Sequence, residues 1–220
     1  MKFVAVDDGS FSPLPGTKWI CNWSQRLLYD NAEPTATFED ADGQRLVFDL
    51  GKTPEFVSRH LKAPQYHLTG ARQQARIFDS RTQTFLIFTT TKSAPDTGIL
   101  SAIEDRNGNK IQFIYVSGKL SRVICPDGAA FSIKTTPQGY IETITKEGEA
   151  NPLISYSYDS SGAMTDINSR FDGELHYGYM AQGWLQHCRN SGITTIDLEY
   201  DNQSIVDNIQ KRARESNTDT

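Results

Sequence analysis

The feature that most constrains the fold is a 21-residue repeat in the second half of the chain. The segment Ile154–Met164 is matched by Leu175–Leu185, and a third copy opens at Ile196. In each copy, apolar residues alternate with polar or small ones up to a tyrosine, which is the period of a strand with one buried face. A glycine four positions after that tyrosine can supply the positive φ of a short hairpin loop. The pattern therefore predicts repeated antiparallel β-hairpins.

The same register extends towards the N-terminus. Ile111–Leu120 is a copy whose loop is one residue shorter, and Phe131–Ile141 is a copy with Thr135 at the tyrosine position. The aligned positions are 115, 135, 158, 179 and 200, so the copies differ slightly in length. We place these insertions and deletions in the loops, as is typical of stacked units that share one sheet. The residues that define the repeat are Tyr115, Gly118, Gly139, Tyr158, Asp159, Gly162, Tyr179, Gly183, Tyr200 and Asp201.

We divide the chain into three segments. Residues 1–98 form an aromatic-rich β segment, in which hairpins are predicted at residues 35–50 and 75–88, with residues 51–74 and 89–97 as connections. Residues 99–201 hold the hairpin repeats. In the tail, residues 202–220, Ile205, Ile209 and Ala213 are four apart, which predicts a short amphipathic helix followed by disorder. The expected fold is all-β, a twisted and curved sheet that forms part of a shell.

Composition and charge exclude several classes of function. The formal charge is −5 and no cluster of Lys and Arg is present, so nucleic acid is not an expected partner. No stretch has the length of a membrane helix or of a signal-peptide core, which predicts a soluble cytoplasmic product whose export would need a dedicated secretion system. The three cysteines, Cys21, Cys125 and Cys188, lack C-x-x-C spacing and are expected to be idle thiols.

Motifs for catalysis and metal binding are missing. Asp105, Asn107 and Asn109 are spaced like the start of a calcium loop, but position 12 is Val116, so a polar hairpin turn is the better interpretation. The four histidines have no carboxylate or cysteine at ligand spacing, and neither a G-x-S-x-G elbow nor a phosphate-binding glycine loop is present. We therefore expect no enzyme activity, no metal and no cofactor.

The tyrosines of the repeat allow two interpretations. The aromatic side chains of Tyr156, Tyr177 and Trp184 could form a face that binds carbohydrate or protein. Aromatic residues at period two in strands more often pack against neighbouring strands, and this is the interpretation that we favour.

Together these motifs resemble those of a known family. The Tyr-Asp-x-x-Gly units at about 21 residues, the turn Asp105-Arg-Asn-Gly-Asn109 before them, and the opening Gly16-Thr-Lys-Trp19 resemble the YD repeats of bacterial Rhs proteins and the segment that precedes them. That family is related to the shells of insecticidal toxin complexes and to animal teneurins. The resemblance covers roughly residues 10–201, and the literal Tyr-Asp pair occurs at Tyr158 and Tyr200.

The resemblance implies a β-strand spiral that closes into a hollow shell around a toxin, delivered by a machine such as type VI secretion in competition between bacteria. The chain departs from the family because it has no Asp-Pro self-cleavage motif and no room for a cargo domain after Tyr200. It is thus expected to be a non-enzymatic piece of shell. A sheet of this kind has open edges, so the expected partner is the rest of a shell, a second copy or a toxin domain.

Overall fold

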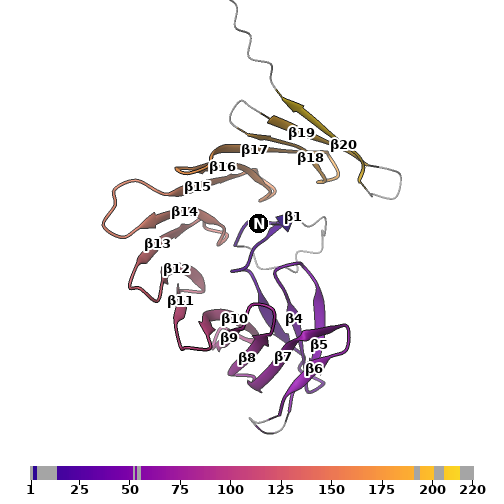
Figure 1. Cartoon of the computed structure of the whole chain (residues 1–220), viewed down its shortest axis with the longest axis vertical. Helices are drawn as coiled ribbons and strands as arrows, with labels where there is room; N and C mark the ends of the chain where they lie inside the picture. The colour runs from indigo at the N-terminus through magenta and orange to yellow at the C-terminus, as the bar shows by residue number, and fades with distance from the viewer. Residues whose placement is uncertain are drawn as a thin grey trace, which may run out of the picture.

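The computed structural model describes residues 2–3, 14–51, 53, 56–190, 194–200 and 206–213. Within these residues the fold is all-β (Figure 1). The strands before the repeats are β1 (Lys2–Phe3), β2 (Trp19–Ile20), β3 (Arg26–Tyr29), β4 (Thr35–Glu39), β5 (Arg45–Asp49), β6 (Ser58–His60), β7 (Ala63–Ala71), β8 (Gln74–Asp79), β9 (Thr84–Thr91) and β10 (Ala94–Asp105). The repeat strands are β11 (Lys110–Val116), β12 (Lys119–Ile124), β13 (Ala130–Thr135), β14 (Ile141–Lys146), β15 (Ile154–Tyr158), β16 (Met164–Ser169), β17 (Gly173–Tyr179), β18 (Leu185–Asn190), β19 (Thr194–Tyr200) and β20 (Val206–Ala213).

The long strand β10 joins two parts of one antiparallel sheet. Residues 97–99 of β10 pair with β3, residues 102–104 pair with β11, and β9 pairs along the opposite edge. On the N-terminal side, β3, β4 and β5 follow one another, and β6 to β9 lead back to β10, so this part rolls into a compact lobe. On the C-terminal side, β11 to β20 continue hairpin by hairpin as an open, curved sheet (Figure 1).

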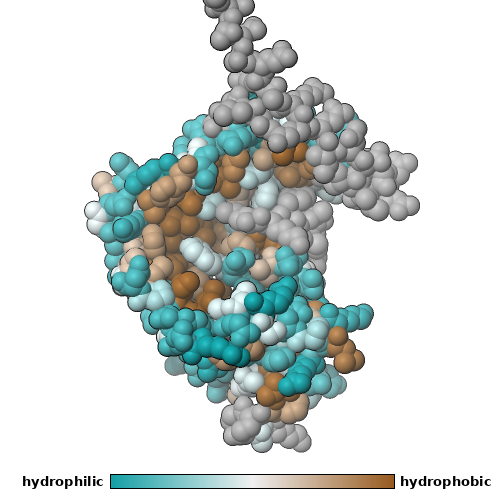
Figure 2. Space-filling view, in the orientation of Figure 1, coloured by the Kyte–Doolittle hydropathy of each residue, from teal (hydrophilic) through white to brown (hydrophobic). Residues whose placement is uncertain are grey.

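Alternating burial along the strands explains the core. In β5 the side chains of Leu46 and Phe48 are buried while their neighbours are exposed, as the two-residue period requires. The lobe is filled by large apolar side chains such as Phe38 and Phe88, both of which are fully buried. The core continues along the inner face of the repeats, and Figure 2 shows apolar side chains gathered inside the curve with a hydrophilic outer rim.

The predicted hairpins of the first segment and the repeat register are confirmed. β4 pairs with β5 and β8 with β9, over the ranges that the sequence indicated. Each aligned position pairs with an apolar residue across its loop, and in each case a bulge directly precedes the pair: Tyr115 with Leu120, Thr135 with Ile141, Tyr158 with Met164, Tyr179 with Leu185 and Tyr200 with Val206.

Two segments predicted as connections are strands. Residues 51–74 contain β6 and β7, and residues 89–97 contain the end of β9 and the beginning of β10. Pro64 and Pro95 obscured this, but each is the second residue of its strand. A proline is tolerated at the start of a strand, where its missing N–H need not break a central ladder.

The predicted helix in the tail is also wrong, because residues 206–213 form β20, which pairs with β19. Positions four apart lie on one face of a strand as well as of a helix, so the spacing of Ile209 and Ala213 could not separate the two. The fifth copy therefore extends beyond residue 201, where the repeat segment was predicted to end, and has both strands of its hairpin. The expected disorder at the end of the chain falls outside the described residues.

Candidate functional site

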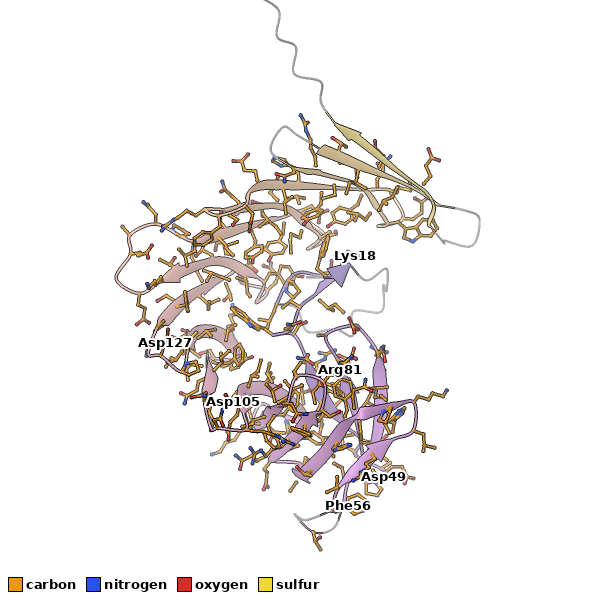
Figure 3. The ribbon with its side chains drawn as sticks, in the orientation of Figure 1. Lys18, Asp49, Phe56, Arg81, Asp105 and Asp127 are labelled. Carbon is orange, nitrogen blue, oxygen red and sulfur yellow. The ribbon has the colours of Figure 1, made fainter. Side chains whose placement is uncertain are left out.

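A segment before β3 lies across the inner face of the repeats. We call residues 14–25, which include β2, the strap. The N–H of Ile141 donates to the carbonyl oxygen of Leu14 at 2.8 Å, and the N–H of Thr17 donates to that of Gly162 at 2.9 Å. Lys18 continues the row at the next loop, where a Cβ on Gly183 would lie 3.0 Å from its Nζ. Figure 3 shows Lys18 on the strap, on the inner side of the curved sheet. The strap thus touches the loops of three successive copies along one edge of the sheet.

The strap is anchored by Trp19. Its side chain is 8% exposed, its ring centroid lies 4.7 Å from that of Tyr177, and its indole N–H donates to the hydroxyl oxygen of Tyr179 at 2.7 Å. Further along, Trp23 packs edge-on against Phe113 at 5.6 Å. The strap therefore links the first hairpin of the repeats to the fourth.

The repeat tyrosines join each hairpin to the one before it. The hydroxyl of Tyr158 donates to the carbonyl oxygen of Ile141 at 2.6 Å, and that of Tyr179 donates to Met164 at 2.5 Å. Tyr115 makes the corresponding bond to Leu100 in β10 at 3.0 Å. Ile141 and Met164 are the cross-loop partners of the preceding aligned positions. We call this contact, which recurs at Tyr115, Tyr158 and Tyr179, the tyrosine ladder. Its role is structural, and alternation alone could not reveal its acceptors.

Burial of these hydroxyl groups changes their titration. Burial raises the pKa of Tyr177 and Tyr179 to about 12, and it raises the pKa of Tyr115 and Tyr158 further. Burial away from water disfavours the phenolate, so the folded state holds its protons more tightly than the unfolded chain does.

We expect the protein to lose stability in alkali. Because the folded pKa values lie above the unfolded value of about 10, the stabilisation is complete below pH ~10 and is lost as the pH rises towards 12. Urea unfolding at a series of pH values should show this fall, and tyrosinate absorbance should appear together with unfolding. Ladder tyrosines that titrate with a midpoint near pH 10 while the protein stays folded would contradict the burial of the ladder.

The aspartate of the Tyr-Asp pair closes the loop. Oδ1 of Asp159 accepts the N–H groups of Ser161 at 2.8 Å and Ala163 at 3.0 Å, and the φ of Gly162 is +82°. Asp105 binds Asn107 and Asn109 in the same way, which supports a hairpin turn at the calcium-like motif. The loop that begins at Met180 has the same backbone bonds but no carboxylate.

Replacing Met180 with aspartate should stabilise the protein. The Met180→Asp side chain would accept two loop N–H groups, as that of Asp159 does, and a net gain of about 0.5–1.5 kcal/mol in the free energy of unfolding is expected. Asp159→Ala should reduce the free energy of unfolding by a similar amount. Urea denaturation measures both, and a Met180→Asp protein no more stable than Met180→Ala would contradict the role given to the aspartate.

The predicted aromatic binding face lies largely under the strap. Tyr156 is 8% exposed and Tyr177 packs on Trp19, whereas Trp184 is half-buried in the loop before β18. The side chains of Tyr200 and Asp201 are outside the described residues. A cleft of about 310 Å³ remains between the strap and strands β14 and β15, and it is lined by Pro15, Cys21, Asn22, Trp23, Ile141, Ile144, Ile154 and Tyr156. This apolar cleft is one part of the inner face that stays open.

The lobe contains a buried charge cluster that sequence reasoning missed. The Glu39 carboxylate is 1% exposed and accepts N–H donation from Arg26 at 2.5 Å and from Arg45 at 3.0 Å. At the turn between β8 and β9 of the same lobe, Arg81 makes a separate set of contacts: it donates to the Tyr66 hydroxyl at 2.7 Å and contacts Asp79. Arginine on both sides of a buried carboxylate compensates its charge, so this cluster fixes how β3, β4 and β5 pair. Its residues lie in separate strands, and no spacing in the sequence connects them.

Neither a metal centre nor a cofactor site is assigned. Within the ranges that the structure describes, no three His, Cys, Asp or Glu side chains come together as ligands would. Cys21, Cys125 and Cys188 are free and partly buried, and burial raises the pKa of the Cys21 and Cys188 thiols. No helix with the length and apolar character of a membrane span occurs in the described residues.

Comparison with known proteins leaves the family open. Neither the protein-family models nor the curated proteins contain a match to the chain. Among solved structures, the chain is similar to one titled "Crystal Structure of TcdB2-TccC3-TEV", with a TM-score of 0.39 and 12% sequence identity. The match covers 85% of this chain and 12% of that chain.

Proposed function

We propose that the chain is a non-enzymatic wall segment of an Rhs-type shell that encloses a toxin. The observation that carries the proposal is the hairpin-on-hairpin contact of the repeats. Tyr158 and Tyr179 bind the preceding unit in the same way, so further units can add without a new kind of interface. Under this proposal the chain acts by enclosing, and delivery by a dedicated secretion system during competition between bacteria would be the work of other parts of the assembly.

Two further features support a wall. The repeat sheet is curved, and its inner face is apolar where the strap leaves it open (Figures 1 and 2). Among the described residues, β20 pairs with β19 along one edge, and no strand register is formed along its other edge. A free strand edge presents unpaired N–H and C=O groups to another strand, so a wall segment would continue there.

Self-association through β20 tests the proposal. We expect light scattering to show association that increases with protein concentration. Consecutive N–H groups of a strand point to opposite sides, so one of the two variants Asn208→Pro and Ile209→Pro should block the free edge and leave pairing with β19 intact. A protein that stays monomeric at all concentrations would count against an extendable wall.

A binding module that uses the aromatic face is the competing function. A glycan array separates the two, because the wall proposal predicts no specific binding. Tyr177→Ala and Tyr179→Ala are the controls. Glycan binding that both substitutions abolish would replace the wall with a carbohydrate-binding module.

A further inference from the structure

The outer face of the lobe carries exposed apolar side chains. In β6, Ser58 is buried, so Val57 and Arg59 on either side of it point away from the core. Leu61 follows directly after β6, and the neighbouring strand β5 adds Val47 to the outer face. The exposed fractions are 45% for Val57, 100% for Leu61 and 56% for Val47.

Leu61 protrudes from a hairpin loop. His60 pairs with Ala63, so Leu61 and Lys62 are the two loop residues between β6 and β7. Loops of this length favour Asn, Gly and Asp, so turn geometry does not explain a leucine there. A fully exposed leucine also gains nothing from packing within the protein. Phe56, 44% exposed, extends the exposed apolar side chains to the end of the lobe furthest from the repeats (Figure 3).

The charge around these side chains is positive. Arg59 and Lys62 are exposed, and neither forms an ion pair within the described part of the chain. In the sequence just before them, Lys52 and Glu55 balance each other, and β5 adds one exposed acid, Asp49. The face is therefore positive in a chain whose formal charge is −5.

We propose that this surface docks on an anionic lipid membrane, and we call Val47, Val57, Arg59, Leu61 and Lys62 the lobe patch. Leu61 and Val57 enter the apolar layer, and the two cations bind lipid phosphates, which their long aliphatic stems allow. A protruding loop residue suits a soft lipid layer, whereas these few side chains form a smaller area than stable protein interfaces bury. The inference is independent of the wall function.

Phe171 provides a contrast within the same protein. It is 72% exposed in the loop between β16 and β17. Its neighbours in the chain are Arg170, which pairs with Glu149, and Asp172. Phe171 therefore has apolar exposure without an unpaired cation beside it, and it serves as the matched control.

Vesicle flotation with the whole chain tests the lobe patch. With phosphatidylcholine vesicles that contain about 30% phosphatidylserine, we expect half-maximal binding at a lipid concentration on the order of 1 mM. Binding should be lost in pure phosphatidylcholine and in about 0.5 M salt. Lys62→Gln should weaken it about fivefold, and Leu61→Asp about twentyfold or more. Phe171→Asp should leave it unchanged.

These variants should fold, because both lobe positions are exposed, and equal urea midpoints will verify it. The proposal is overturned if the protein does not bind the anionic vesicles, or if Leu61→Asp binds them as the unsubstituted protein does. It is also overturned if Phe171→Asp weakens binding as much as Leu61→Asp. Light scattering without lipid gives a further outcome: self-association that Leu61→Asp abolishes would make the lobe patch a contact between copies and overturn membrane docking.

Discussion

Trp19→Ala should reduce the free energy of unfolding by about 3–5 kcal/mol, the range for removing a large buried aromatic side chain. The substitution removes the ring that packs on Tyr177 and the indole N–H that donates to Tyr179. The loss should appear in urea denaturation as a lower midpoint, and amide exchange should become faster in β17 and in the strap together.

Trp19→Phe is the matched control. It keeps an aromatic ring near Tyr177 but removes the donor to Tyr179. We therefore expect an intermediate reduction of about 1–2 kcal/mol in the free energy of unfolding. If Trp19→Ala reduces the free energy of unfolding by less than ~1 kcal/mol, the strap does not hold the repeats together.

Gly16→Ala is the second substitution with a large expected effect. The φ of Gly16 is +87°, and an added Cβ would lie 2.5 Å from the carbonyl oxygen of Gly162 and 2.8 Å from the ring of Tyr158. The Gly162 carbonyl and the Tyr158 ring are both part of the repeat sheet, so the strap must move away from them to make room for the added Cβ. We expect a loss of about 2–4 kcal/mol, measured by urea denaturation.

Gly108→Ala and Gly128→Ala separate strain from contact. These glycines have φ values of +84° and +85°, but an added Cβ would meet nothing within 4 Å. Each substitution should therefore reduce the free energy of unfolding by only about 1–2 kcal/mol, which is the strain of placing an alanine at a positive φ. If Gly16→Ala reduces the free energy of unfolding by no more than these two substitutions do, the close contact between the strap and the loop at Gly162 is contradicted.

The repeat register could be predicted because it depends on neighbours in the chain. A tyrosine at the end of an alternating strand and a glycine after it indicate a hairpin locally, which is why positions 115 to 200 aligned correctly. The threonine at position 135 was also visible in the sequence, because it stands where the other aligned copies carry tyrosine.

What the sequence could not predict depends on distant contacts. Thr17 and Gly162 are 145 residues apart, and nothing near either residue indicates that they touch. The same holds for Glu39, whose buried position is explained by Arg26 on the neighbouring strand. In β20 the local pattern was ambiguous, and pairing with β19 decided between helix and strand, as tertiary context often does.

Duplication of one repeat tests most directly the claim that the chain is an extendable wall. A copy of residues 164–184 inserted after Trp184 keeps the 21-residue period and adds one complete unit. We expect a protein that unfolds in a single cooperative transition, with both added strands protected in hydrogen exchange to the same degree as β16 and β17. An inserted unit that exchanges as fast as an unfolded chain, or that unfolds the hairpins on either side of it, would show that the repeats cannot be extended as a wall.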